Sequence, residues 1–523
     1  MEKGIMGIGK TLLLTLALLL TNNACGREKL PDTDSSNNTN ELVSATLDVS
    51  SRPLAETFMC FNVNSLRVQS WQREKFQQAV KNLNPSMLRI PGGAVGNYWD
   101  WQKGGLIDDT SNLAEGLPRF MRGSLKYQAS TLPNYQEGLE ATETAPLFVV
   151  NMLTGDLPSQ MEMLRTARDL GMAIKYVELG NEFYFNIPNY RQGFATPQDY
   201  ATMAAEWTEE IKKEFPEAKI AVLGVVPPPD KPARLQTWNS SLLDAGLPEA
   251  DAITLHIYED HGLDQTQITR QEYPFFDETE IPIILGQPFH HWQQLTEDKN
   301  YQLIPKNKKI WFTEYNLMED IFGKNRGTKP RVLGSWLHGL YNLTTSLLFL
   351  EDSRTEIICN HDLVSNYVFG AILANKNSFP NPDTGVSEAV PLSLSATGST
   401  LEMLGSATRG MNKANKISFT NNSSLTGKDN LTYPALYGWM FSNATDEQAI
   451  IVNLSSENKQ LHLQSLFREP ASYEQLHGYP WDLVDKKGIL VENSGVVTDK
   501  IDLPAYSVTK FSTILSDPES END

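Results

Sequence analysis

The sequence predicts an α/β fold, a (β/α)8 TIM barrel followed by an antiparallel β-sandwich, and three observations support this. Between residues 57 and 412, short apolar runs alternate with segments whose apolar residues recur at helical spacing, as in βα units. Beyond residue 413, short β-rich runs separated by Asn, Ser and Gly turns indicate antiparallel strands. The length of 523 residues accommodates a barrel of roughly 250 to 400 residues and one smaller domain.

The barrel strands are expected where apolar runs end in turn residues or polar residues. They are expected at residues 57–64, 87–91, 146–153, 176–179, 218–225, 252–258, 309–314 and 356–360. Helices are expected between most of them, and one begins at Thr196-Pro197, a capping residue before proline. Residues 104–144 show no clear period, and the roughly 50 residues between strands six and seven are too long for a bare connection.

The domain boundaries follow from the same patterns. We expect the catalytic barrel at residues 53–412, the β-sandwich at 413–515 and a short tail at 516–523. Residues 41–52 contain an isolated strand that is expected to complete the sandwich. Both ends of the folded chain would then meet in one sheet.

The amino terminus has the layout of an export signal. Basic residues precede an apolar run at 11–20, which predicts a signal peptide over residues 1–24. Cys25 follows Ala24, as in a bacterial lipoprotein, so lipidation at Cys25 and a flexible tether over 25–40 are predicted. The protein is therefore expected on the periplasmic or outer side of a bacterial membrane, with plain secretion as the alternative.

The composition excludes several classes of function. Hydrophobic residues make up 40% and charged residues 21%, as in ordinary globular proteins. The net charge of −20 argues against binding to nucleic acid, which is a polyanion, and against the role of a basic protein that binds a membrane surface. An acidic polysaccharide is disfavoured for the same reason, unless a local basic pocket binds it.

The three cysteines form neither a disulfide framework nor a zinc motif. Cys60 and Cys359 fall on the predicted first and eighth strands, which are neighbours in a closed barrel. A disulfide between them would suit an oxidising compartment, but two buried free thiols are the preferred interpretation. The pair His290-His291 lacks further ligands at recognisable spacing, so no metal and no cofactor are expected.

Two glutamates stand at the carboxyl ends of predicted strands, where barrel enzymes place their chemistry. Glu182 ends strand four and Glu314 ends strand seven. Such a pair predicts a retaining glycosidase, with Glu182 as acid/base and Glu314 as nucleophile. Mutual repulsion is expected to hold one of their pKa values high. Strict alternation along the strand makes Glu178 a rival acid, and Asn181 and Glu182 reach one site only if the strand end is irregular.

Alternation also predicts which neighbours share a face with these residues. Ile310, Phe312 and Glu314 are expected on one face of strand seven. Thr254, His256 and Tyr258 are expected on one face of strand six.

Several ordered motifs stand at or near the ends of predicted strands. They are Gly180-Asn181-Glu182, Thr313-Glu314-Tyr315-Asn316, Arg89-Ile90-Pro91-Gly92-Gly93 with Trp99 and Trp101, His256-Ile257-Tyr258 and Leu503-Pro504-Ala505-Tyr506-Ser507-Val508. Together they resemble clan A retaining glycoside hydrolases, nearest to the family 51 α-L-arabinofuranosidases and relatives in families 39 and 79, and the resemblance covers most of residues 50–512. The sequence departs from the family at Phe183-Tyr184-Phe185 and at Thr313, which precedes Glu314 in place of an acidic residue.

The resemblance implies roles for residues around the two glutamates. Asn181 would bind the sugar 2-hydroxyl, and Arg89 would support the nucleophile electrostatically. His256 and Tyr258 match positions that hold the nucleophile or the sugar. Trp99 and Trp101 are candidates for stacking on a sugar face.

The predicted function is a retaining glycoside hydrolase that removes terminal sugars, with arabinofuranose first, from polysaccharide side chains or oligosaccharides. The expected partner is a carbohydrate, and the oligomeric state is left open. Alternatives within the same clan are a β-glucuronidase, a β-xylosidase or an endo-acting polysaccharide hydrolase. A transglycosylase would share the same residues. A non-catalytic carbohydrate-binding lipoprotein is the alternative from another class.

Overall fold

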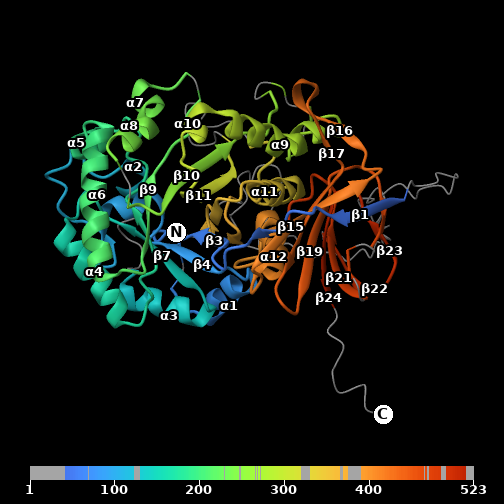
Figure 1. The fold of residues 1–523 in the computed structure, drawn as a ribbon, viewed down its shortest axis with the longest axis horizontal. Helices are drawn as coiled ribbons and strands as arrows, with labels where there is room; N and C mark the ends of the chain where they lie inside the picture. Colours follow the sequence, from blue (N-terminus) through green and yellow to red (C-terminus); the bar gives the residue numbers. More distant parts are fainter. Residues whose placement is uncertain are drawn as a thin grey trace, which may run out of the picture. The chain divides into compact units, whose positions relative to one another are not determined.

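The computed structural model describes most of the chain after residue 41 (Figure 1). The described residues are 42–68, 70–122, 130–228, 230–246, 249–264, 267, 269–270, 273–319, 330–365, 369–374, 390–463, 466–467, 470–484 and 490–513. The predicted signal peptide, Cys25, the tether and the tail lie outside these residues. None of the described helices is long and apolar enough to span a bilayer.

Eight parallel strands close into a barrel, which confirms the predicted fold class (Figure 1). In chain order they are β3 (Met59–Asn62), β4 (Met87–Ile90), β7 (Ala145–Val150), β8 (Tyr176–Leu179), β9 (Lys219–Leu223), β10 (Ala252–Glu259), β11 (Lys309–Leu317) and β12 (Thr355–Asn360). The barrel closes where β12 pairs with β3, with Cys359 opposite Cys60. The strands are almost wholly buried because helices cover the outside of the barrel.

The helices of the barrel region vary in length. They are α1 (Glu74–Asn82), α2 (Arg119–Arg122), α3 (Leu132–Thr142), α4 (Leu157–Asp169), α5 (Pro188–Gly193), α6 (Pro197–Glu214), α7 (Ala233–Gln236), α8 (Trp238–Asp244), α9 (Ile281–Glu297), α10 (Lys299–Gln302), α11 (Trp336–Phe349) and α12 (Ala396–Thr408). Thr196 caps α6 as predicted, in a capping box with Asp199. The sequence did not predict α3 and α9, which contain Gly138 and Pro288, respectively, and therefore lack an uninterrupted helical pattern.

The carboxyl-terminal domain is a mostly antiparallel sheet. Its strands are β1 (Val43–Leu47), β2 (Arg52–Pro53), β15 (Lys413–Thr420), β18 (Leu436–Ser442), β19 (Glu447–Asn453), β20 (Lys459–His462), β21 (Ala471–His477), β22 (Val491–Val497), β23 (Lys500–Leu503) and β24 (Ser507–Thr513). The amino-terminal strand β1 pairs antiparallel with β15 and parallel with β20, so it joins this sheet as predicted.

Alternation along the sheet strands gives the domain two apolar faces. Met440 and Ile451 belong to the core of the sheet domain itself, whereas Trp439 and Ile450 belong to the large core shared with the barrel helices. The indole of Trp336 on α11 donates a hydrogen bond to Tyr506 O (2.6 Å). The barrel and the sheet domain therefore belong to one compact unit.

Short elements complete the described chain. They are the 3-10 turns η1 (Gly93–Tyr98) and η3 (Lys428–Asn430), and the strand pairs β5 (Trp99–Asp100) with β6 (Gly105–Leu106), β13 (Val364–Ser365) with β14 (Ile372–Leu373), and β16 (Ser424–Thr426) with β17 (Thr432–Pro434).

The lower part of the barrel interior is an apolar layer. Its buried members are Cys60, Met87, Leu147, Ala221, Ala252, Trp311, Ile357 and Cys359. A disulfide joins Cys60 and Cys359 across the strands that close the barrel. The preferred interpretation of two free thiols is therefore wrong, because pairing of β3 with β12 places the two side chains directly opposite each other.

Candidate active site

A charged layer lies above the apolar one, toward the carboxyl ends of the strands. Glu178 on β8 and Arg89 on β4 are both fully buried and form a two-point ion pair, with Nε–Oε2 2.6 Å and Nη2–Oε1 3.1 Å. Burial alone would raise the pKa of Glu178, but the charges of Arg89 and His256 lower it below its usual range. Glu178 is therefore held ionised by its contact with Arg89.

The end of β8 is irregular, as the prediction required. The strand stops at Leu179, and Gly180 has φ of 85°. A Cβ on Gly180 would lie 2.1 Å from the ring of Phe183, so only glycine fits this turn. After the turn, Asn181 accepts a hydrogen bond from Arg89 Nη2 (2.8 Å), while Glu182 continues into the barrel mouth with φ of 55°.

Strand β11 carries a bulge that brings Glu314 into the barrel. Phe312 faces outward and stacks on Phe349 of α11, with ring centroids 3.8 Å apart. The pairing of β11 shifts register against both β10 and β12 close to Glu314. Thr313 and Glu314 consequently both contact inward groups. The expectation that Ile310, Phe312 and Glu314 share one face is wrong, because the bulge interrupts strict alternation.

Glu314 is buried and held from two sides. Arg89 Nη1 donates to its Oε1 (2.8 Å), and Tyr258 Oη donates to its Oε2 (2.5 Å). Burial raises the pKa of Glu314, but the charges of His256 and Arg89 together with the Tyr258 hydroxyl lower it well below its usual range. A Cβ on Gly93 would lie 3.0 Å from Oε1, so the backbone of this glycine approaches the carboxylate closely.

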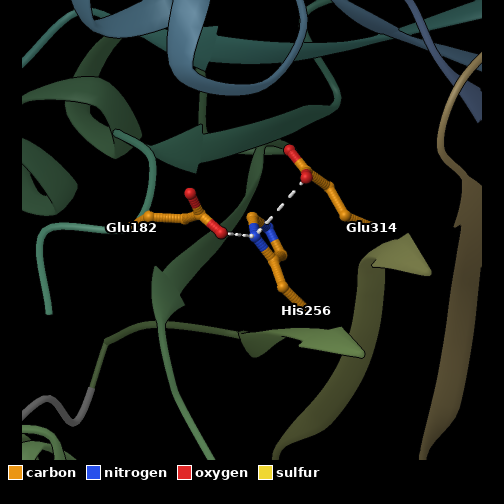
Figure 2. Close-up of side chains that lie close together, drawn as sticks. All are labelled: Glu182, His256 and Glu314. Atoms are coloured by element: carbon orange, nitrogen blue, oxygen red, sulfur yellow. Dashed lines mark hydrogen bonds and ion pairs between the residues drawn. The ribbon is translucent and has the colours of Figure 1, made fainter. Parts of the chain in front are cut away.

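His256 lies between the two glutamates, which come from opposite sides of the mouth (Figure 2). Its Nδ1 is 2.9 Å from Glu182 Oε1 and 3.8 Å from Glu314 Oε2. Burial lowers the pKa of His256, but the charge of Glu314 and the contacts with Glu178 and Glu182 raise it to about 10. One oxygen of each carboxylate and one ring nitrogen lie within 4.8 Å of one another. His256 and Tyr258 of β10 both contact Glu314, as alternation along the strand predicts.

Among the described residues, Glu182, His256 and Glu314 form the group whose spacing could hold a metal ion. The chemistry of the group argues against one. A metal ligand must be a neutral imidazole, whereas the pKa of His256 is raised to about 10. Both oxygens of Glu314 already accept hydrogen bonds, from Arg89 and Tyr258.

The structure brings two further polar residues to the site that sequence reasoning missed. Asn62 ends β3 and accepts from Arg89 Nη1 (3.0 Å), and its amide contacts the ring of His361. His361 follows β12, and its Nδ1 is 3.7 Å from Glu314 Oε2. Both positions stand at the carboxyl ends of barrel strands, and this rule applied to strands one and eight would have found them.

Asn181 contributes a donor without a protein partner. Because a guanidinium only donates, the contact with Arg89 fixes Oδ1 of Asn181 on that side. Its Nδ2 then points away and has no hydrogen-bond partner in the described chain, although the residue is fully buried. A buried amide with a free donor suits a ligand oxygen.

The ring contacts of Trp99 and Trp101 in the described chain are with residues of the barrel helices. Trp99 is 3% exposed and packs edge-on against Tyr135 at 6.0 Å between ring centroids. Trp101 donates from its indole nitrogen to Ser159 on α4 (3.2 Å). The described contacts of both rings therefore lie with the barrel helices and not with the glutamate pair.

Solved structures share this fold across the chain. A family 51 α-L-arabinofuranosidase from Bifidobacterium longum matches with a TM-score of 0.66 at 14% identity, covering 90% of this chain and 99% of its own. A GH51 arabinofuranosidase from Xanthomonas axonopodis matches at 0.63 and 13%, covering 90% and 99%. A 4-O-α-L-rhamnosyl-β-D-glucuronidase from Fusarium oxysporum matches at 0.55 and 13%, covering 90% and 100%.

These similarities define the class of fold. Each is a likeness to a glycosidase structure, and at these identities it establishes the barrel and the sheet domain of this chain. No protein-family model matches the sequence, and no curated protein matches it either.

Proposed function

We propose that the protein is a retaining glycoside hydrolase, with Glu182 as acid/base and Glu314 as nucleophile. The observation that supports this most strongly is the approach of their carboxylate oxygens within 4.8 Å across the barrel mouth. Retaining enzymes place the two carboxyl groups about 5 to 5.5 Å apart, whereas inverting enzymes leave about 6.5 to 9.5 Å for a water molecule.

The environments of the two glutamates support this division of roles. Glu314 is held ionised because its pKa is lowered and both its oxygens accept charge-assisted or hydroxyl hydrogen bonds. Glu182 is more open, with its side chain 19% exposed, and its Oε1 lies 2.9 Å from Nδ1 of His256, a group that can pass a proton to it. The nucleophile must be ionised and the acid must have a proton to give, and these residues meet those needs.

In the first step, a Glu314 oxygen attacks the anomeric carbon while the bond to the leaving oxygen breaks. Glu182 gives its proton to that oxygen, so the leaving group departs as an alcohol. Positive charge that develops on the sugar is stabilised by the Glu314 carboxylate, which Arg89 and Tyr258 keep in one orientation.

In the second step, Glu182 takes a proton from water as the water oxygen attacks the same anomeric carbon. The bond to Glu314 breaks, and the carboxylate is restored. Two inversions give net retention. His256 stays in contact with Glu182 and can take up and return the proton, since the two atoms lie 2.9 Å apart.

For the substrate, we propose a terminal α-L-arabinofuranose on a polysaccharide side chain or oligosaccharide. Its support is the resemblance of the four strand-end motifs together with the arabinofuranosidase names of several structural neighbours. A β-glucuronide is the second candidate substrate, because one structural neighbour is a glucuronidase. A β-xylosidase or an endo-acting hydrolase is a further outcome of the same screen. We also propose an exported, lipid-anchored location from the sequence of the amino terminus.

A non-catalytic sugar-binding protein is the alternative from another class. A protein that only binds sugar has no need for an ionised carboxylate buried beside Arg89, because such a group costs free energy to desolvate. This cost favours catalysis over binding alone.

The experiment is a screen of nitrophenyl glycosides and polysaccharides, followed by proton NMR of the first product formed. We expect hydrolysis of at least one glycoside and a first product with the anomeric configuration of the substrate. Addition of acceptor sugars separates hydrolysis from transglycosylation. An inverted first product would contradict the proposed mechanism, and binding without turnover on every sugar would favour the non-catalytic alternative.

A further inference from the structure

His361 lies in the site, yet no step above uses it. Its backbone is fixed by neighbours on β11: the N–H donates to Tyr315 O (3.1 Å), and Asn316 Nδ2 donates to the His361 carbonyl (2.5 Å). Its ring contacts Asn62 from β3, and its side chain is 20% exposed. Strands one, seven and eight of the barrel thus hold one imidazole beside the proposed nucleophile.

The hydrogen bonds of Asn62 fix the tautomer of that imidazole. Asn62 Oδ1 accepts from Arg89 Nη1 (3.0 Å) and from the Gly93 N–H (3.3 Å). Both of those groups only donate, so the amide orientation is settled and Nδ2 faces His361 Nδ1. A ring nitrogen that accepts carries no hydrogen. In this arrangement the ring hydrogen of His361 therefore lies on Nε2.

The Nε2–H group lies at the opposite edge of the ring and is free. Among the described residues it has no hydrogen-bond partner, and it is not sealed from solvent. The ring is held edge-on by Tyr258 and Phe369, with centroids 6.0 Å and 5.8 Å away. A fixed donor with a free hydrogen, next to Glu314, is arranged for a ligand and not for the fold alone.

We propose that His361 is a substrate-binding residue whose Nε2–H donates a hydrogen bond to a hydroxyl of the sugar that Glu314 attacks. The proposal rests on the proposed function and names a specificity contact within it. The free Nδ2 of Asn181 is a second donor on the other side of Glu314, bound to the same Arg89. A sugar whose hydroxyls accept from both donors would be oriented with its anomeric carbon at the carboxylate.

The test is a double-mutant cycle between the side chain and the sugar hydroxyls. Wild type, His361→Phe and His361→Gln are assayed on 4-nitrophenyl α-L-arabinofuranoside and its 2-, 3- and 5-deoxy analogues. If the screen identifies another sugar, its nitrophenyl glycoside and deoxy analogues are used. Phenylalanine keeps the ring packing and removes the donor, whereas glutamine keeps an N–H. His462→Phe is the control, because His462 pairs with Asp499 in the sheet domain.

We expect His361→Phe to lower kcat/KM about tenfold on the parent glycoside, the order of one hydrogen bond in a closed site. For one deoxy analogue, kcat/KM of wild type should fall by a similar factor relative to the parent glycoside. For His361→Phe, kcat/KM should be the same on that analogue as on the parent glycoside. His361→Gln should recover part of the loss, and His462→Phe should match wild type. If every deoxy analogue lowers kcat/KM of His361→Phe by the same factor as it lowers kcat/KM of wild type, the proposed contact is overturned.

Failure of this contact and failure of the proposed function give different results. If Glu314→Gln is inactive but the cycle shows no coupling, only the role of His361 is wrong. If Glu314→Gln keeps full activity, the proposed function itself is wrong. Should His361→Phe fail to fold, as judged by circular dichroism, His361→Gln carries the same cycle, with a smaller expected coupling that must still exceed that of His462→Phe.

Discussion

The two layers inside the barrel are built on different physical principles. The lower layer is filled by apolar side chains and the Cys60–Cys359 disulfide, and it needs only volume and shape. The upper layer buries Arg89, Glu178, His256 and Glu314, whose desolvation costs free energy, so that each charge depends on contacts with the others. The fold alone does not require buried charges, because apolar side chains could fill the same space. The contrast between the layers therefore supports a catalytic role for the upper layer.

The largest expected effect comes from removing the charge of one upper-layer carboxylate. Glu314→Gln should lower kcat about 10⁴-fold or more, because the amide is a poor nucleophile. The matched control is Glu356→Gln, a buried glutamate of β12 that pairs with Lys219 and the indole of Trp311 at the other end of the barrel. Glu356→Gln should keep kcat near wild type and lower only the melting temperature. Equal losses in the two variants would erase the functional distinction between the layers.

Loss of the proposed acid should depend on the leaving group. Glu182→Gln should lower kcat/KM about 10²- to 10⁴-fold for sugars with poorly acidic leaving alcohols, since these need the proton. The loss should be much smaller for a dinitrophenyl glycoside, whose leaving group departs without help. Steady-state kinetics across a series of aryl leaving groups measure this. A loss independent of leaving-group pKa would remove Glu182 from the acid role.

The third prediction concerns stability and compares two positions on β4. Arg89→Met leaves Glu178 buried without its partner and should cost about 3 to 5 kcal/mol of unfolding free energy. Met87→Leu, two residues earlier in the apolar layer, should cost less than about 1.5 kcal/mol. Urea denaturation of the two variants measures the difference. Similar losses at both positions would show that the layers are energetically alike.

The smallest effect is a pH dependence of stability. The pKa of His256 is raised to about 10 in the folded protein, so its stabilising contribution is complete below its unfolded value of 6.5 and is lost as pH rises toward 10. The lowered pKa of Glu314 works in the opposite direction: its contribution is present above 4.5 and is lost as pH falls through its folded pKa. Between pH 6.5 and 10, the unfolding free energy should therefore decline as pH rises.

The variant His256→Asn should flatten that alkaline decline. His338 offers a control, because burial lowers its pKa to about 3 and it stays neutral throughout the same range. His338→Asn should shift the whole stability curve without changing its slope between pH 6.5 and 10. An unchanged slope in His256→Asn would mean that other groups titrate there.

The sequence predicted the barrel, the joining of the amino-terminal strand to the carboxyl-terminal sheet, and the meeting of Glu182 with Glu314. These rest on periodicity and on the rule that parallel strands bring their carboxyl ends together. Strands β21, β22 and β23 were not predicted. In β22 six of seven residues are exposed, so an apolar pattern is missing.

Other features depend on geometry that no local pattern carries. The bulge that turns Glu314 inward is visible only as a register shift between paired strands. The choice of Glu182 over Glu178 depends on Arg89, which is 89 residues from Glu178 in sequence and bonds it at 2.6 Å in space. The disulfide likewise depends on the register of β3 against β12.

The central claim is that Glu314 forms a covalent bond to the sugar. The most direct measurement is mass spectrometry of the protein after incubation with a 2-deoxy-2-fluoro glycoside of the preferred sugar, which slows release of the intermediate. We predict a mass increase of one fluorosugar, carried after digestion by the peptide that contains Glu314. A label on another residue, or turnover with no adduct and an inverted product, would contradict the account.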